Sequence, residues 1–180
     1  HLVMPVNEEN GEIKQDVERD IAKVAIIERH NKTGNIRVGL VHGFGLNIPC
    51  ALATTFAHDS HQMIVVGTDD ENMVMAANYL ASIGGGEVVV KGREILGEVQ
   101  LPIGGLMSLE PATEVAAQTR TLLEGFRICG CSLNNPNMQL SLLALTVIPE
   151  IRMTDLGLID VTQFKFIPVI EPEIFNKDSL

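Results

Sequence analysis

Apolar and polar residues alternate along the chain in short runs, and one of these runs is entirely apolar. Met63–Val66 is uninterrupted and rich in β-branched residues, which is typical of a strand buried on both faces. A strand at the edge of a sheet is usually protected by polar or charged residues, and this run has none. We therefore predict that Met63–Val66 lies in the centre of a sheet, with a neighbouring strand on each side.

Two further pairs of apolar runs predict strands that lie side by side. Ile21–Arg29 and Ile36–Val41 are separated by Asn31–Asn35, a stretch of turn-forming residues, so we expect a hairpin. Glu87–Lys91 and Glu94–Leu101 are separated by two residues and predict a second pair.

Two segments carry the signals of helices. Thr68 precedes a group of acidic residues and is the expected N-cap of a helix over about 69–83. Gly84–Gly86 would end this helix, because glycine readily adopts the left-handed conformation of a C-cap. Pro111–Ile128 predicts a second helix with one apolar face.

The intermixed strands and helices predict an α/β or α+β fold, with a mixed β-sheet and a few packed helices. Cys50–Phe56 fits a strand or a short helix, and Met138–Val147 fits a buried helix or a strand. The expected organisation is a linker and first strand over residues 1–20, one domain over 21–170 and a tail over 171–180.

Composition narrows the classes of function. The net charge is −10 and basic residues are scattered, so we expect no nucleic-acid partner. No apolar stretch is long enough to span a membrane, and we expect no membrane partner. An odd number of cysteines, three, argues against a disulfide scaffold and favours the cytoplasm. The chain begins abruptly at His1, which suggests a fragment of a longer protein.

The densest group of chemically active side chains is His58-Asp59-Ser60-His61, immediately before the buried strand. These residue types occur in hydrolytic triads, but triad members converge from separate segments, so we reject a local triad. His58 and His61 could ligate a metal, although no other ligand stands at a recognisable zinc spacing. Alternatively, Asp59 and Ser60 cap the strand entrance through local backbone hydrogen bonds.

Several stretches together carry a resemblance to a known family. They are Asp20–Lys23, Glu28–His30, Thr33–Ile36, Gly43–Leu46, Ala57–His61, Ile64–Thr68, Gly84–Gly86, Leu101–Ser108, Ile148–Glu150, Thr154–Leu158 and Phe164–Phe166. The chain resembles the C-terminal domain of the microbial adenine deaminases, metal-dependent enzymes of the amidohydrolase superfamily. The Ala-His-Asp-Ser-His run is the most specific part of this resemblance. His42 stands where the family usually has a lysine.

The resemblance implies that residues 21–170 are an accessory domain and that a TIM barrel belongs to the same enzyme. The barrel's divalent metals, manganese or iron in a two-metal centre, activate water for the hydrolysis of adenine to hypoxanthine and ammonia in purine salvage. The barrel's metal-ligand motifs are absent here, so we assign no catalytic and no metal residue to this chain and expect it to hold no cofactor. The implied partners are the enzyme's own N-terminal barrel, adenine and further copies in a homo-oligomer.

Two hypotheses remain open. In the first, His58, Asp59, Ser60 and His61 lie near the substrate and help to close or support the barrel's active site. In the second, the chain is a purely structural or oligomerisation domain that does not contact substrate. A solvent-facing position of this loop would favour the first hypothesis, and burial in the domain's own core would favour the second.

Overall fold

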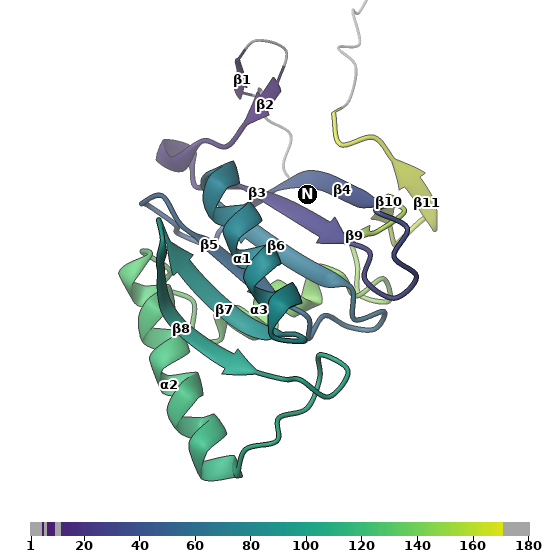
Figure 1. The fold of residues 1–180 in the computed structure, drawn as a ribbon. Coiled ribbons are helices and arrows are strands. Elements are labelled where there is room, and N and C mark those ends of the chain that lie inside the picture. Colours follow the sequence, from purple (N-terminus) through teal and green to yellow (C-terminus); the bar gives the residue numbers. More distant parts are fainter. Residues whose placement is uncertain (1–4, 6, 10–11, 171–180) are drawn as a thin grey trace, which may run out of the picture.

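The computed structural model describes residues 5, 7–9 and 12–170 (Figure 1). Its strands are β1 (Asn7–Glu9), β2 (Glu12–Lys14), β3 (Ile21–Ile27), β4 (Ile36–His42), β5 (Ala51–Thr54), β6 (Met63–Gly67), β7 (Gly86–Lys91), β8 (Glu94–Gln100), β9 (Ile151–Thr154), β10 (Gly157–Asp160) and β11 (Lys165–Ile167). Its helices are α1 (Asp70–Ser82), α2 (Ala112–Ile128), α3 (Pro136–Leu142) and a 3-10 turn at Val17–Arg19.

A six-stranded sheet organises the domain, in the order β4-β3-β6-β5-β7-β8. The prediction for Met63–Val66 is confirmed, because all five residues of β6 are buried and β3 and β5 pair with its two edges. Both predicted strand pairs are confirmed as β3–β4 and β7–β8. The predicted fold class is also confirmed. Every pairing within this sheet is antiparallel, so the fold is α+β and the sheet does not mix strand directions.

Helices cover the sheet on both faces (Figure 1). On one face α1 packs over β5, β6 and β7, and its buried residues Met73, Ala76 and Leu80 meet Val65 and Val88. On the other face lie α2, α3 and the three-stranded sheet β11-β10-β9. Strands that are covered on both faces must be apolar on both, which explains the uninterrupted run in β6.

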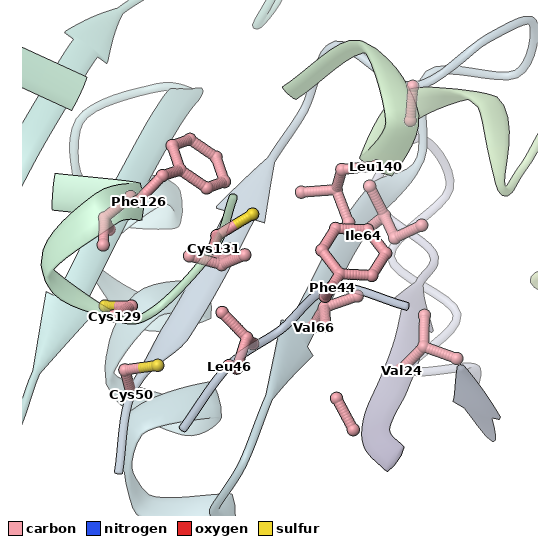
Figure 2. Close-up of a cluster of buried hydrophobic side chains, with 14 of the residues drawn as sticks. Val24, Phe44, Leu46, Cys50, Ile64, Val66, Phe126, Cys129, Cys131 and Leu140 are labelled. Atoms are coloured by element: carbon pink, nitrogen blue, oxygen red, sulfur yellow. The ribbon is translucent and has the colours of Figure 1, made fainter. Parts of the chain in front are cut away.

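The core on the second face is aliphatic with two aromatic rings (Figure 2). Phe44 and Phe126 contribute these rings among Val, Ile and Leu side chains. Cys50, Cys129 and Cys131 are free and buried in the same core. Since buried thiols behave as small apolar side chains, packing accounts for the cysteines without a disulfide.

The start of α1 differs from the prediction by one residue. Asp69, not Thr68, is the N-cap, and its carboxylate accepts a hydrogen bond from the backbone N–H of Asn72. Thr68 is occupied elsewhere, because its hydroxyl donates to Ile48 O at 2.7 Å and accepts from Cys50 N at 3.0 Å. A tertiary contact therefore takes Thr68 away from the helix. The helix ends before Gly84–Gly86 as expected.

The close packing of α2 on β8 depends on a glycine. A Cβ atom at Gly97 would lie 2.6 Å from the Leu122 Cα and 2.8 Å from its backbone nitrogen. Only a residue without a side chain lets the helix backbone approach the strand this closely. As a result, Leu122 and Phe126 reach the core from α2.

The two ambiguous segments are now assigned. Cys50–Phe56 contains β5, and the region around Met138–Val147 begins with the short α3 followed by turns. Residues after 151 form the short strands β9, β10 and β11, and the expected tail at 171–180 lies outside the described residues. The expected linker contains the β1–β2 hairpin. In the part of the chain that the structure describes, no helix is long and apolar enough to cross a membrane.

Candidate functional site

The candidate site lies at one end of the six-stranded sheet. In an antiparallel sheet, β3 and β5 end where β6 and β7 begin, because neighbouring strands run in opposite directions. This end therefore collects four segments that are distant in sequence, namely Glu28–His30, Thr55–Gln62, Gly84–Gly86 and the loop that follows β8. Connecting segments on a rigid sheet commonly carry function.

The Ala57–Gln62 loop is anchored at its two ends and exposed in its middle. Ala57 and Gln62 are buried, Asp59 and Ser60 are exposed, and His58 and His61 are partly buried. The backbone N–H of His61 donates to Ala57 O at 2.7 Å and closes the loop. Among the described residues, no hydrogen bond involves the side chain of Asp59 or Ser60, so the alternative in which these two side chains cap the strand has no support from the geometry.

Three rings form a small cluster beside this loop. The Phe56 ring lies 4.9 Å from the His58 ring and 5.6 Å from the His61 ring, measured between centroids. The two imidazoles are themselves 5.6 Å apart. The structure thus brings together the two histidines that the sequence analysis proposed as substrate-proximal, and their role stays a prediction.

The hydrogen bonds of His58 indicate its tautomer. His58 Nδ1 lies 3.2 Å from Ser141 Oγ, and the Ser141 hydroxyl donates to Met138 O at 3.0 Å. Since a hydroxyl has one proton to donate, Ser141 accepts from His58 Nδ1–H in this arrangement. The neutral ring then presents Nε2 as an acceptor, which could take a proton or receive a hydrogen bond from a ligand.

His61 is held in a different electrostatic environment. Burial lowers the pKa of His61, and the charge that His58 carries when protonated and the charge of Arg29 lower it further. Its Nδ1 is buried and has no hydrogen-bond partner among the described residues. The imidazole is therefore favoured in its neutral form, with Nδ1 buried and unpaired among the described residues.

The short helix α3 adds two polar side chains one turn apart. Ser141 meets His58, and Asn137 Nδ2 donates to Glu87 Oε2 at 3.3 Å. Glu87 pairs with Thr54 across β5 and β7. Burial raises the pKa of Glu87, while hydrogen bonds from Asn137 and Thr54 oppose that change. The helix thus places an amide and a hydroxyl beside an acid and a histidine.

Arg29 connects two loops of the site. Its Nε donates to His61 O at 2.6 Å and its Nη2 donates to Gly104 O at 2.8 Å. Its backbone N–H donates to Gln62 Oε1 at 2.9 Å. A planar guanidinium donates in several fixed directions at once, which suits it to hold two backbone carbonyls.

The turn beside Arg29 is built around Glu28. The carboxylate of this buried residue accepts hydrogen bonds from the backbone N–H groups of His30, Asn31 and Thr33 and from the Thr33 hydroxyl. These bonds, led by the one from Thr33 N–H, lower the pKa of Glu28 to about 2. The turn places His30 Nε2 at 2.7 Å from Ser60 O.

Sequence reasoning missed Arg29, Ser141, Asn137 and Glu87. Glu28–His30 was noticed only as part of a resemblance, and the segment with Ser141 was ambiguous between helix and strand. Among the residues that the structure describes, no three or more His, Cys, Asp or Glu are grouped so that they could hold a metal ion. The ligands that the described chain offers therefore do not fit a metal centre.

Comparison with known proteins identifies the family. The model of the adenine deaminase C-terminal domain matches residues 1–165. The chain belongs to this family. It is 55% identical over 160 residues to an adenine deaminase of Ruegeria sp., which covers 89% of this chain and 26% of the relative. It is 55% identical over 152 residues to that of Roseobacter denitrificans, covering 84% of this chain and 25% of the relative.

A third relative shows the same relationship. Adenine deaminase 3 of Rhizobium meliloti is 50% identical over 162 residues, which is 90% of this chain and 27% of the relative. The chain therefore spans about a quarter of the length of the curated relatives it matches. The suspected resemblance to the C-terminal domain of adenine deaminases is confirmed.

Proposed function

We propose that this chain is the C-terminal domain of an adenine deaminase that hydrolyses adenine to hypoxanthine and ammonia, and that its Ala57–Gln62 loop forms part of the purine pocket or its immediate surroundings. His58, Asp59, Ser60 and His61 are the residues that we propose to lie near the substrate. The observation that carries this proposal is the position of the loop, whose middle is exposed at the end of the sheet instead of buried in the domain's own core.

The chemistry of the loop supports contact with a purine. A purine presents ring nitrogens and an exocyclic amine, which imidazole, hydroxyl and carboxylate groups can all hydrogen-bond. His58 would offer Nε2 as an acceptor, and His61 is favoured in its neutral form by burial, which lowers its pKa. The partly buried rings are also held in place by Phe56 and Ser141, which limits the entropy lost on binding.

The rest of the machinery belongs, in this proposal, to the part of the enzyme outside this domain. By family resemblance, that part is an N-terminal amidohydrolase barrel that holds two divalent metal ions, manganese or iron. The proposed setting is purine salvage in the cytoplasm, in a homo-oligomeric enzyme. Because the chain spans about a quarter of its relatives, we expect the 180-residue chain alone not to deaminate adenine.

The test is the kinetics of the full-length enzyme with His58→Ala, Ser60→Ala or His61→Ala, corrected for the folded fraction. If a side chain acts only in the transition state, its loss lowers kcat, and if it only binds purine, its loss raises KM. For at least one histidine we expect kcat/KM to fall about tenfold or more, the equivalent of about 1.4 kcal/mol. His42→Ala is the matched control, because His42 is exposed and lies at the end of the sheet away from the Ala57–Gln62 loop.

The alternative is a purely structural or oligomerisation domain. It requires normal kcat and KM in all three loop variants, with changes confined to stability or assembly. That result would contradict the proposed function.

A further inference from the structure

The loop that follows β8 is uncharged and carries exposed apolar side chains. This 101–109 loop (Leu101–Leu109) has no acidic or basic residue in a chain that is 20% charged. Ile103 is 42% exposed, Met107 is 59% exposed and Leu109 is 74% exposed. Single exposed apolar residues are ordinary, but three within seven positions of one loop mark a candidate interaction surface.

The 101–109 loop is ordered by its own hydrogen bonds. Ile103 and Met107 exchange backbone hydrogen bonds at 3.2 Å in both directions and form an antiparallel bridge. Side chains directly opposite each other in such a bridge point to the same side. Ile103 and Met107 therefore form one small apolar face, which a partner could contact without first ordering the loop.

A shallow groove extends this face. It has a volume of about 680 Å³ and lies between the loop and the first turns of α2, where Leu101, Leu106, Met107 and Val115 contribute most of its apolar side chains. Such a groove could accept side chains of an opposing surface, while the exposed apolar residues beside it pack against that surface.

The 101–109 loop and the Ala57–Gln62 loop are held together as one unit. Arg29 donates to His61 O at 2.6 Å and to Gly104 O at 2.8 Å. The Thr55 hydroxyl donates to Gly105 O at 2.7 Å and accepts from Gly86 N at 2.8 Å. Whatever the histidines of the Ala57–Gln62 loop face must therefore come close to Ile103 and Met107 as well.

We propose that the 101–109 loop, through Ile103, Met107 and Leu109, is the surface on which the N-terminal part of the same polypeptide docks. This proposal rests on the proposed function, because that function requires the Ala57–Gln62 loop to face the rest of the enzyme. About three quarters of each relative lies outside this domain, which leaves a large body that must pack on it. Interfaces between domains of one chain bury roughly 600–1,500 Å², more than the apolar face alone, so the neighbouring histidine loop would be included.

The first experiment is oxidative footprinting of the full-length enzyme with mass spectrometry. The reference is Met75, which is partly buried on α1, on the opposite face of the sheet from α2 and α3. Met107 is 59% exposed, so an undocked surface predicts faster oxidation of Met107 than of Met75. Docking reverses this order, and we expect Met107 to be oxidised several-fold more slowly than Met75. Oxidation of Met107 at the same rate as Met75, or faster, would overturn the proposal.

The second experiment places a charge on the surface. In the full-length enzyme, Met107→Glu and Leu109→Glu should each lower kcat/KM about tenfold or more, because a charge at the centre of an interface opposes docking. Val147→Glu is the matched control, since Val147 is 67% exposed and lies outside the 101–109 loop, between α3 and β9, and it should leave kcat/KM unchanged. Equal effects of all three substitutions would count against a specific docking surface.

The outcomes separate the possible occupants and the two proposals. If Met107→Glu breaks an oligomer into smaller species on size-exclusion chromatography while activity is retained, a second copy covers the loop and the docking proposal is wrong. If Met107 is protected but the variants of His58, Ser60 and His61 have normal kinetics, docking stands and the proposed function fails. If those variants are impaired and Met107 is unprotected, the proposed function stands and the docking proposal fails.

Discussion

The strand β6 and the Ala57–Gln62 loop follow one another in the sequence, yet different forces hold them. All residues of β6 are buried between two layers of apolar side chains. The loop is held by hydrogen bonds, from the Arg29 side chain to His61 O and from the Arg29 backbone to the Gln62 side chain. Apolar packing is insensitive to direction and to pH, whereas hydrogen bonds fix direction and can depend on ionisation. The domain thus carries a loop whose conformation is fixed by hydrogen bonds on a strand that is stabilised by apolar packing.

The largest expected effect comes from breaking the packed region. Val65→Asp places a carboxylate at a position that is 1% exposed, and no described basic residue pairs with it across β3 or β5, where its partners are Ala25 and Ala53. We expect the free energy of unfolding to fall by about 4 kcal/mol or more. Chemical denaturation followed by circular dichroism measures this change. Val147→Asp, at a position that is 67% exposed, should change it by less than about 0.5 kcal/mol.

A smaller effect is expected at Thr55, which lies between β5 and the Ala57–Gln62 loop. Thr55 is 1% exposed, and its hydroxyl connects Gly86 N to Gly105 O. Thr55→Val keeps the shape but leaves both groups unpaired, which should cost about 2 kcal/mol. Thr121→Val is the control, because the Thr121 hydroxyl makes a longer bond of 3.4 Å on an exposed helix face. Equal stability of the two variants would mean that the hydrogen bonds of Thr55 to Gly86 and Gly105 do not contribute to stability.

The last comparison concerns Glu28 and the pH dependence of stability, which distinguishes hydrogen-bonded from apolar parts of the domain. Its folded pKa of about 2 lies below that of an unfolded glutamate, so its contribution to stability is present above the unfolded pKa and is lost as the pH falls through the folded pKa. Between about pH 5 and about pH 2, Glu28→Gln should therefore lose less stability than the unmodified protein. Thermal unfolding as a function of pH measures the difference.

A matched substitution tests whether this pH dependence is specific. Glu94 is exposed at the start of β8, and Glu94→Gln should leave the acid dependence close to that of the unmodified protein. If both variants show the same reduced loss of stability at acidic pH, the effect comes from net charge and not from the turn that Glu28 organises.

The pattern of apolar residues was sufficient to predict the central strand, two strand pairs and two helices. Burial on two faces demands an apolar run, so Met63–Val66 could be located without coordinates. Hairpins join neighbouring runs through local turns, and β3–β4 and β7–β8 were predicted for that reason. The histidines of the Ala57–Gln62 loop could also be proposed from sequence, because a polar cluster beside a buried strand is a local signal, and their role stays a prediction.

Contacts between distant segments were decided only by the tertiary structure. The N-cap moved from Thr68 to Asp69 because Thr68 bonds to Cys50 and Ile48, about twenty residues away. Ser141 reaches His58 across 83 positions, and Arg29 reaches Gly104 across 75. Local periodicity carries no information on such pairs, because they depend on the order of strands in the sheet and on where α3 packs. Only the tertiary structure therefore reveals the residues that position the candidate site, such as Arg29 and Ser141. The residues that we propose to touch the substrate could be proposed from the sequence alone.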